Sequence, residues 1–355
     1  MNLLAHEEVV VRRGRRSGIY IVVSIHSTVL GPSLGGLRMW PYHALGDAIS
    51  DGLRLSEAMT YKAAAAGLDI GGGKAVICLP PERELPPDER RDLMLDVGDI
   101  VDSLDGRYVT AEDVGTGTDD MAVIRERTEH VVGLPIDSGG SGDPSPITAR
   151  GVESAIRASC SHRYGRGNLA GRRVSVVGLG HVGSHLAERL AADGAELCVT
   201  DIDPGRRELA DRLGARWLDP AKAMTAECEV LAPCALGGVI DGDNADRLGC
   251  EIVCGAANNV LAERVLADRL AEHGVLYAPD FIANAGGLIN VYGELHSLDR
   301  ERLDSLVDGI GEALSRVFSA AEERSVTPLE AARALAEERL DSAREAAIGV
   351  PASAV

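Results

Sequence analysis

Two lysines, Lys62 and Lys74, lie twelve residues apart and flank a cluster of small residues and glycines. Lys74 directly follows Gly71–Gly73, a run without side chains that a ligand can approach closely. Burial among apolar residues lowers the pKa of a lysine, so that it can act as a base near neutral pH. The other lysine can stay charged and hold a carboxylate. The pattern favours a site for a small acid that exchanges protons; the alternative is a solvated lysine on a helix, followed by a glycine-rich turn.

A second candidate site is the sequence G-x-G-x-x-G, formed by Gly178, Gly180 and Gly183. The strand-like run 174–177 precedes it and a helical pattern follows it, which is the context of a dinucleotide-binding loop. The first glycine permits the tight turn, the second lets a pyrophosphate approach the backbone, and the third lets helix and strand pack closely. The phosphates would lie at the free N–H groups of the helix N-terminus.

Asp201 decides which dinucleotide this loop is expected to bind. It lies 18 residues beyond Gly183, at the end of the next predicted strand. A carboxylate there accepts hydrogen bonds from ribose hydroxyls and repels a 2′-phosphate, which favours NAD over NADP. Arg206 and Arg207 nearby argue in the other direction, and Asp203 is the weaker alternative to Asp201.

The glycine-, serine- and proline-rich stretch 138–146 is the strongest linker signal in the chain. Apolar runs and helical periodicity before it predict strands at 18–24 and 76–79 and helices over 45–66 and 87–104. We therefore expect residues 1–140 to form an α/β domain that contains both lysines of the first candidate site.

After the linker, short apolar runs alternate with helical patterns, as in a parallel sheet with helices on both faces. Residues 141–324 are expected to form a doubly wound Rossmann domain that binds NAD. The last fifty residues are rich in Ala, Glu, Arg and Leu and predict helices. Those over about 325–355 are expected to pack back on the first domain.

The composition sets limits on function. The 355 residues are 45% hydrophobic and 26% charged, which is typical of a globular protein with two domains. The net charge of −19 argues against binding to nucleic acid or to anionic membranes. No signal peptide is expected, because residues 1–8 lack a basic region followed by a long apolar core, and no apolar run reaches the roughly 18 residues of a membrane span. Seven scattered cysteines and dispersed histidines predict reduced thiols, no metal site and a cytoplasmic location.

Several blocks together resemble the glutamate/leucine/phenylalanine/valine dehydrogenase family, in particular its smaller, non-glutamate branch. The blocks are Gly31–Met39, Met59–Lys62, Gly71–Lys74, Tyr108–Thr116, Ser145–Thr148, Gly178–Gly183, Ala232–Gly238, Gly255–Asn259 and Ala278–Gly287. They occur in the family's order over nearly the whole chain. The resemblance implies an NAD-dependent amino-acid dehydrogenase that forms a homo-oligomer, a dimer or higher. It also implies that residues 1–140 are the domain for substrate binding, catalysis and oligomerisation.

The resemblance also implies roles for individual residues. Lys62 holds the substrate carboxylate, Lys74 is the catalytic acid and base, and Asp113 is its catalytic partner. The implied substrate-binding set is Lys62, Gly35, Gly36, Leu34, Met59, Ala111 and Asn284. The implied cofactor-binding set is Gly178, Gly180, His181, Val182, Gly183, Asp201, Thr148, Ala235, Asn259 and Asn284. Within it, Thr148 and Asn259 face the nicotinamide half, Ala235 contacts the adenosine side, and no metal takes part.

The implied reaction is an oxidative deamination. A hydride leaves the substrate Cα for the nicotinamide and gives an imino acid. Neutral Lys74 activates the water that attacks the imine, and Asp113 moves protons to and from the nitrogen. Ammonia and a 2-oxo acid are the products.

Leu34 and Ala111 bear on the choice of amino acid. Family members that act on glutamate carry a lysine where this chain has Leu34, so an apolar substrate side chain is expected. Ala111 resembles the leucine and valine enzymes, whereas the segments 257–260 and 279–284 resemble phenylalanine enzymes. Branched aliphatic substrates (leucine, valine, isoleucine) are favoured, and aromatic substrates (phenylalanine or tryptophan) are the alternative.

Two other classes of protein have to be weighed. A non-catalytic NAD-binding sensor would have no reason to keep Lys74 together with Asp113, so their presence argues against it. A 2-hydroxy-acid dehydrogenase would need a His/Arg pair to polarise a carbonyl, and the motifs place none.

Overall fold

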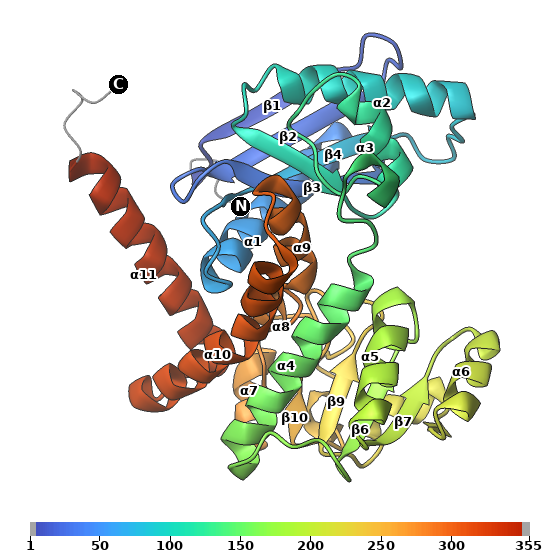
Figure 1. The fold of residues 1–355 in the computed structure, drawn as a ribbon, viewed down its shortest axis with the longest axis vertical. Helices are drawn as coiled ribbons and strands as arrows, with labels where there is room; N and C mark the ends of the chain where they lie inside the picture. The colour runs from blue at the N-terminus through green and yellow to red at the C-terminus, as the bar shows by residue number, and fades with distance from the viewer. Residues whose placement is uncertain (1–4, 350–355) are drawn as a thin grey trace. The chain divides into compact units, whose positions relative to one another are not determined.

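The computed structural model of the protein describes residues 5–349 (Figure 1). They form two compact units, each assembled from separate stretches of the chain. The first contains the chain up to Asp143, Val291–Leu298 and the residues from Ala336 onward; the second contains Pro144–Asn290 and Asp299–Leu335. The chain therefore passes from one unit to the other four times. The sequence predicted a division after residue 140 and the return of residues from about 325 to the first domain, but not the return of Val291–Leu298.

A five-stranded sheet forms the centre of the first unit. Its strands are β1 (Glu8–Arg13), β2 (Tyr20–Ser27), β3 (Ser33–Pro41), β4 (Gly71–Leu79) and β5 (Tyr108–Glu112). The order is β1-β2-β4-β3-β5; β3, β4 and β5 run parallel, whereas β2 is antiparallel to both β1 and β4. The central strands are buried along nearly their whole length, as expected for a sheet covered on both faces.

Helices cover the two faces of this sheet. On one face α1 (Leu45–Ala65) packs its Ala48 against Val76 of β4. On the other, α2 (Pro87–Asp102) and α3 (Thr118–Arg125) contribute Met94 and Met121 to a core that contains Ile77. Successive side chains of a strand point to opposite faces. Lys74, two residues before Val76, therefore lies on the α1 face.

Two later segments complete the first unit. In Val291–Leu298, Glu294 accepts hydrogen bonds from the backbone N–H groups of Gly133 (3.0 Å) and Ser141 (2.8 Å). In α11 (Pro328–Gly349), Leu340 packs on Ala64 of α1, and Arg339 donates to the Ala64 carbonyl oxygen at 3.0 Å. These contacts join residues far apart in sequence, so helical periodicity alone did not predict the return of Val291–Leu298.

The second unit is a doubly wound fold. Its six strands are β6 (Arg173–Val177), β7 (Glu196–Thr200), β8 (Arg216–Trp217), β9 (Val230–Pro233), β10 (Ile252–Val253) and β11 (Leu276–Tyr277), in the order β11-β10-β9-β6-β7-β8. All neighbours are parallel, which confirms the expected sheet. The order reverses between β6 and β9, the place where folds of this kind bind ligands.

The helices of the second unit flank this sheet. They are α4 (Ser145–Tyr164), α5 (His181–Ala192), α6 (Arg207–Arg212), α7 (Leu266–Glu272), α8 (Asp280–Ala283), the first part of α9 (Gly286–Leu295), and α10 (Arg300–Arg324). The last part of α9 belongs to the first unit, as does α11 from Ala336 onward. The predicted helical C-terminal region corresponds to α10 and α11, with residues 350–355 outside the described part of the chain.

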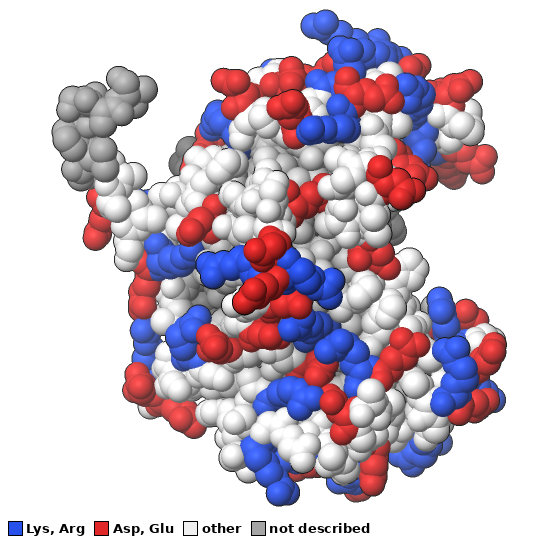
Figure 2. Space-filling model, in the orientation of Figure 1, with Lys and Arg blue, Asp and Glu red and all other residues white. Residues whose placement is uncertain are grey.

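The surface and the thiols agree with the composition. On the face drawn in Figure 2, acidic and basic side chains are interspersed, so that this face carries no continuous basic stripe. All seven cysteines are free thiols, and five of them are buried. Across residues 5–349, no helix has the length and apolar character of a membrane span. The same residues include no cluster of three or more His, Cys, Asp or Glu placed to hold a metal ion.

Candidate active site

Lys74 and Asp113 form an ion pair in the first unit. Lys74 Nζ lies 2.8 Å from Asp113 Oδ2, and the two side chains are 5% and 25% exposed. Burial lowers the pKa of Lys74, although the Asp113 charge opposes this effect. Burial acts to raise the pKa of Asp113, but the charges of Lys74 and Arg38 outweigh it and the pKa is lowered. A lysine that releases its proton readily, beside a carboxylate that stays ionised, is suited to acid–base chemistry.

Lys74 reaches Asp113 across the strand that separates them. β3 lies between β4 and β5, and the strand registers place Gly36 of β3 beside both Lys74 and Ala111. A Cβ atom added at Gly36 would lie 2.7 Å from the Asp113 Cβ and 3.3 Å from Lys74 Nζ. Gly36 therefore leaves the space in which the lysine and the aspartate meet.

The three glycines before Lys74 belong to a strand. They are the first residues of β4, so the alternative of a glycine-rich turn is wrong. A Cβ atom at Gly72 would lie 2.1 Å from the backbone nitrogen of Thr60, and one at Gly73 would lie 2.7 Å from the Tyr108 ring. The expected approach of a ligand to these glycines is also wrong, because α1 and β5 fill the space beside them.

The other predicted substrate residues lie on the elements around the ion pair. Leu34 (1% exposed) and Ala111 (6% exposed) are on the same face of the sheet as the pair, by the alternation of strand side chains. Lys62 and Met59, both partly exposed, are on the last two turns of α1. At Gly35 an added Cβ atom would lie 1.7 Å from a β4 carbonyl oxygen, so this glycine permits close contact between two strands.

In the second unit, the predicted phosphate loop joins β6 to α5. Gly178 has φ +102°, and a Cβ atom at Gly183 would lie 1.9 Å from the Gly178 carbonyl oxygen, so the fold of the loop needs both glycines. A Cβ atom at Gly180 would meet nothing within 4 Å. His181 and Val182 begin α5 directly after it. Open space at a helix N-terminus fits the pyrophosphate of a dinucleotide.

Asp201 lies directly after β7 and is held against this loop. Its Oδ2 accepts a hydrogen bond from the Leu179 backbone N–H at 2.6 Å, and its Oδ1 accepts one from the Asp203 N–H at 2.8 Å. Asp203 instead accepts from the Gly205 N–H at 2.8 Å and lies 3.8 Å from Arg206. Of the two acids considered from the sequence, Asp201 is the one in contact with the phosphate loop.

Comparisons with known proteins agree with this arrangement. The family sequence model described as Glu/Leu/Phe/Val dehydrogenase, dimerisation domain, matches residues 5–130, and that described as Glutamate/Leucine/Phenylalanine/Valine dehydrogenase matches residues 201–347. A leucine dehydrogenase of Thermoactinomyces intermedius is 43% identical over 344 residues, which are 96% of this chain and 92% of the relative. A valine dehydrogenase of Streptomyces virginiae is 43% identical over 348 residues, 96% and 95% of the two chains.

A solved structure gives the same result for the fold. The crystal structure of L-tryptophan dehydrogenase from Nostoc punctiforme matches with a TM-score of 0.84 and 38% identity, covering 96% of this chain and 98% of that one. The chain belongs to the Glu/Leu/Phe/Val dehydrogenase family. This dehydrogenase is an oxidoreductase acting on CH–NH2 groups, of the small-chain branch that its motifs indicated, and its second unit is a Rossmann-type dinucleotide-binding domain.

The remaining predicted cofactor residues of the dehydrogenase lie in the second unit. Ala235 packs against the phosphate loop, where a Cβ atom at the loop's first glycine would lie 2.7 Å from the Ala235 Cβ. Thr148 lies in the first turn of α4, and the exposed Asn259 has φ +51°. Asn284 is 4% exposed, and its Nδ2 donates to the Asn258 Oδ1 at 2.8 Å. Thr148, Ala235, Asn259 and Asn284 therefore belong to the same unit as the phosphate loop.

Two residues of the site were missed from the sequence. Arg38 donates from Nε to Asp113 Oδ2 at 3.0 Å and from Nη1 to Asp51 Oδ2 at 3.1 Å. The sequence could have indicated Arg38, because this residue lies two positions after Gly36 in the same strand and its side chain therefore shares a face of the sheet with Gly36. Nothing in the sequence indicated Asp51, since its contact with Arg38 joins a helix to a strand.

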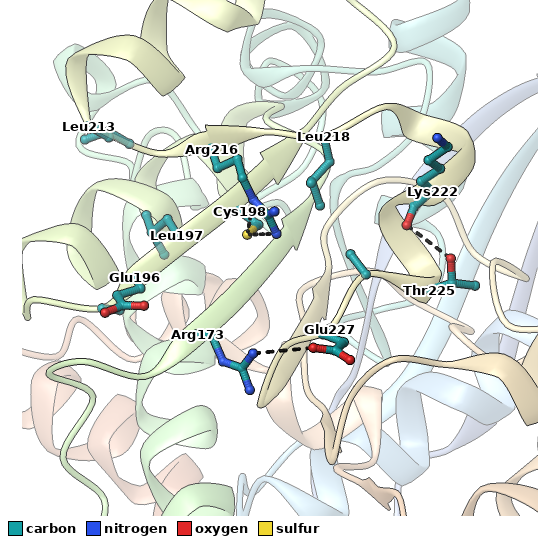
Figure 3. Close-up of a pocket in the computed structure, with 13 residues that line it drawn as sticks. Arg173, Glu196, Leu197, Cys198, Leu213, Arg216, Leu218, Lys222, Thr225 and Glu227 are labelled. Carbon is teal, nitrogen blue, oxygen red and sulfur yellow. Dashed lines mark hydrogen bonds and ion pairs between the residues drawn. The ribbon is translucent and has the colours of Figure 1, made fainter.

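A hollow in the second unit lies away from the phosphate loop (Figure 3). It is lined by Arg173, Glu196 and Arg216, the first residues of β6, β7 and β8, whereas the loop follows the last residue of β6. Arg216 Nη2 donates to the Cys198 Sγ at 3.2 Å inside it. The hollow is therefore at the opposite edge of the sheet from the expected dinucleotide.

Proposed function

We propose that this dehydrogenase catalyses the reversible NAD-dependent oxidative deamination of an apolar L-amino acid, with leucine, valine and isoleucine favoured. The observation that carries the proposal is the Lys74–Asp113 pair, which shares its face of the sheet with the apolar side chains of Leu34 and Ala111. The relatives named leucine and valine dehydrogenase, each 43% identical, support the same substrate class.

Each residue of the first unit has a defined task in this proposal. Lys62 holds the substrate carboxylate. Asp113 exchanges protons with the substrate nitrogen, and Lys74 in its neutral form takes a proton from the water that attacks the imine carbon. When bound, the nicotinamide accepts the hydride and its two electrons from the substrate Cα. One water is consumed, and ammonia leaves after the nitrogen has been protonated.

Leu34 supports an apolar substrate side chain. It is 1% exposed and uncharged, so a substrate carboxylate beside it would be buried without a partner. Burying a charge without a partner costs several kcal/mol. Glutamate is therefore expected to be a poor substrate.

An aromatic substrate is the second candidate. The tryptophan dehydrogenase structure, with its TM-score of 0.84, is the observation in its favour. The leucine and valine dehydrogenase relatives are each 43% identical to this chain, compared with 38% for the tryptophan dehydrogenase structure, so we keep the branched aliphatic amino acids as the first choice.

NAD is proposed as the dinucleotide because of Asp201. Its carboxylate lies against the phosphate loop through the Leu179 N–H at 2.6 Å. A negative charge there would accept the ribose hydroxyls of NAD and oppose the 2′-phosphate of NADP.

We also propose that the dehydrogenase is a homo-oligomer. Residues 5–130 match a family model that is described as a dimerisation domain. Light scattering coupled to size-exclusion chromatography would give the mass, and a monomer at micromolar concentration would contradict this part of the proposal.

An initial-rate panel tests the proposed substrate. NAD reduction is measured with leucine, valine, isoleucine, phenylalanine, tryptophan and glutamate, for the natural protein and for Leu34→Lys. We expect the branched aliphatic amino acids to give the highest kcat/KM, and Leu34→Lys to lose activity on them while gaining on glutamate. A natural protein that prefers glutamate would refute the proposal.

A further inference from the structure

Arg38 connects the proposed catalytic pair to α1. Its Nε donates to Asp113 Oδ2 at 3.0 Å, and its Nη1 donates to Asp51 Oδ2 at 3.1 Å. The same Asp113 oxygen lies 2.8 Å from Lys74 Nζ. Two cations thus hold one oxygen of Asp113, whereas its Oδ1 accepts no hydrogen bond from residues 5–349.

Asp51 braces Arg38 from the other side. Its Oδ2 accepts from the Tyr42 hydroxyl at 2.7 Å, and its Oδ1 lies 2.6 Å from Arg54 Nη2. The Arg38 and Asp51 side chains are only 22% and 17% exposed. A planar guanidinium offers different nitrogens to two carboxylates in a fixed geometry, whereas an ammonium group is a single rotatable point of charge. Arg38 is therefore a rigid link between α1 and the Asp113 carboxylate.

We propose that Arg38 is a positioning residue for the deamination: it holds Asp113 by Oδ2, so that Oδ1 remains available to the substrate nitrogen, and its charge favours the neutral, basic form of Lys74. This inference rests on the proposed function. In this role Arg38 acts through Asp113, by orienting one catalytic group and tuning the other.

The short distance between Arg38 and Lys74 supports the proposed effect of the Arg38 charge on Lys74. Arg38 Nε and Lys74 Nζ each lie within 3.0 Å of one oxygen, so they are at most about 6 Å apart, where like charges disfavour protonation. The guanidinium keeps its proton at all relevant pH values, so Lys74 is the group that responds. In agreement, burial and then the Arg38 charge lower the pKa of Lys74, while the charges of Asp113 and Asp51 oppose them.

Other ionisable groups lie on the same elements. They are Cys78 on β4, Tyr42 after β3, Asp47, Arg54, Glu57, Tyr61 and Lys62 on α1, and Tyr108 and Glu112 on β5. Tyr20 and His26 lie on β2, which pairs with β4. Burial raises the pKa of Tyr42, Cys78 and Tyr108, which favours the neutral form of these three groups. Arg38 is the cation that shares an oxygen with Lys74, and its removal is therefore the cleanest test.

The test compares Arg38→Gln with Arg16→Gln. Arg16 is a matched control in the same unit, because its Nη1 also bridges two carboxylates, Asp96 at 3.0 Å and Asp99 at 2.8 Å. The first readout is the pH dependence of kcat/KM for leucine deamination. The second readout is the pH dependence of trace acetylation at Lys74, which needs no turnover and is measured by peptide mass spectrometry. The chain has only three lysines, and the exposed Lys222 serves as the internal reference.

In Arg38→Gln, the rising limb of the pH profile and the Lys74 labelling curve should both move up by about one pH unit. Below the limb, kcat/KM should fall about tenfold for that reason alone. Arg16→Gln should leave both curves in place, even where its melting temperature drops. Arg38→Lys keeps the charge but not the two-carboxylate bridge, so it should show a smaller shift and a reduced kcat.

The outcomes separate the two proposals. Unshifted curves in Arg38→Gln and in Arg38→Lys, with a lower kcat or lower stability, would give Arg38 a merely structural role and overturn the inference. A natural protein without NAD-dependent deamination of any amino acid would instead overturn the proposed function. The labelling curve would still report in that case whether Arg38 tunes Lys74.

Discussion

Two glycine-rich segments of this dehydrogenase, Gly71–Gly73 and Gly178–Gly183, have different neighbours in the structure. Gly71–Gly73 in β4 is enclosed by protein, and a Cβ atom at Gly72 would lie 2.1 Å from the Thr60 nitrogen of α1. In the loop after β6, a Cβ atom at Gly180 would meet nothing within 4 Å. The first run lets a helix and a sheet close on each other, and the second leaves space for a ligand.

This difference fits the separate tasks that we propose for the two units. Close packing of α1 on β4 buries Lys74, and burial is the main reason that its pKa is lowered. The open loop does the reverse and keeps backbone N–H groups accessible at the start of α5. We therefore expect glycine to support catalysis in one unit by excluding solvent, and to support dinucleotide binding in the other by exposing backbone.

The largest effect is expected from Lys74→Ala. Loss of an acid–base group should lower kcat by about 10²-fold or more, while NAD binding, measured by fluorescence titration, stays unchanged because the phosphate loop is in the other unit. Lys222→Ala is the control lysine variant and should keep full activity, since Lys222 lines the hollow at the far edge of the second sheet. Near-normal turnover in Lys74→Ala would remove Lys74 from the mechanism.

Adding one methyl group to each glycine run tests the comparison directly. Gly72→Ala forces a Cβ atom against Thr60 and should reduce the free energy of unfolding by about 1–3 kcal/mol, measured by urea denaturation. Gly180→Ala should change stability by less than about 0.5 kcal/mol but should weaken binding of the dinucleotide. The contrast between the two runs fails if both variants lose the same stability.

Asp201→Asn addresses cofactor choice in the open loop. The variant keeps a side chain that can accept a hydrogen bond but loses the charge that opposes a 2′-phosphate. We expect the preference for NAD over NADP, as a ratio of kcat/KM values, to narrow by about 1.5–3 kcal/mol, the range for hydrogen bonds to a charged group. If the natural protein has equal kcat/KM values for NADP and NAD, or a higher value for NADP, then Arg206 or Arg207 outweighs the aspartate.

The smallest effect on activity is expected from Ala111→Gly, which removes one methyl group near the Lys74–Asp113 pair. Ala111 is 6% exposed and lies beside Gly36 in the sheet, so Ala111→Gly opens little space near the ion pair. We expect a shift of about 1 kcal/mol in kcat/KM from leucine towards phenylalanine, the order of one buried methyl group. An unchanged ranking of substrates would place the side-chain pocket elsewhere and weaken the branched-chain assignment.

The sequence predicted best what depends on local pattern. The phosphate loop, the strands beside it and the parallel sheet of the second unit follow from short runs of residues, and the family resemblance was confirmed over both units. The glycines before Lys74 were interpreted wrongly because glycine is a poor strand former, and only the approach of Thr60 and Tyr108 shows why the strand needs it here. The link from Arg38 to Asp51 was invisible because it depends on how a helix docks on a strand.

The four passages of the chain between its units matter for recombination among relatives. A chimera with one breakpoint at Asp143 would combine the first sheet of one parent with Val291–Leu298 and the α11 residues of the other. In this chimera, the contact between Ala64 and Leu340 would join residues from two different parents. The same holds for the hydrogen bonds that Glu294 accepts from Gly133 and Ser141. Exchange of a whole nucleotide-binding unit therefore requires four junctions, and single-crossover shuffling is expected to yield mostly mismatched first units.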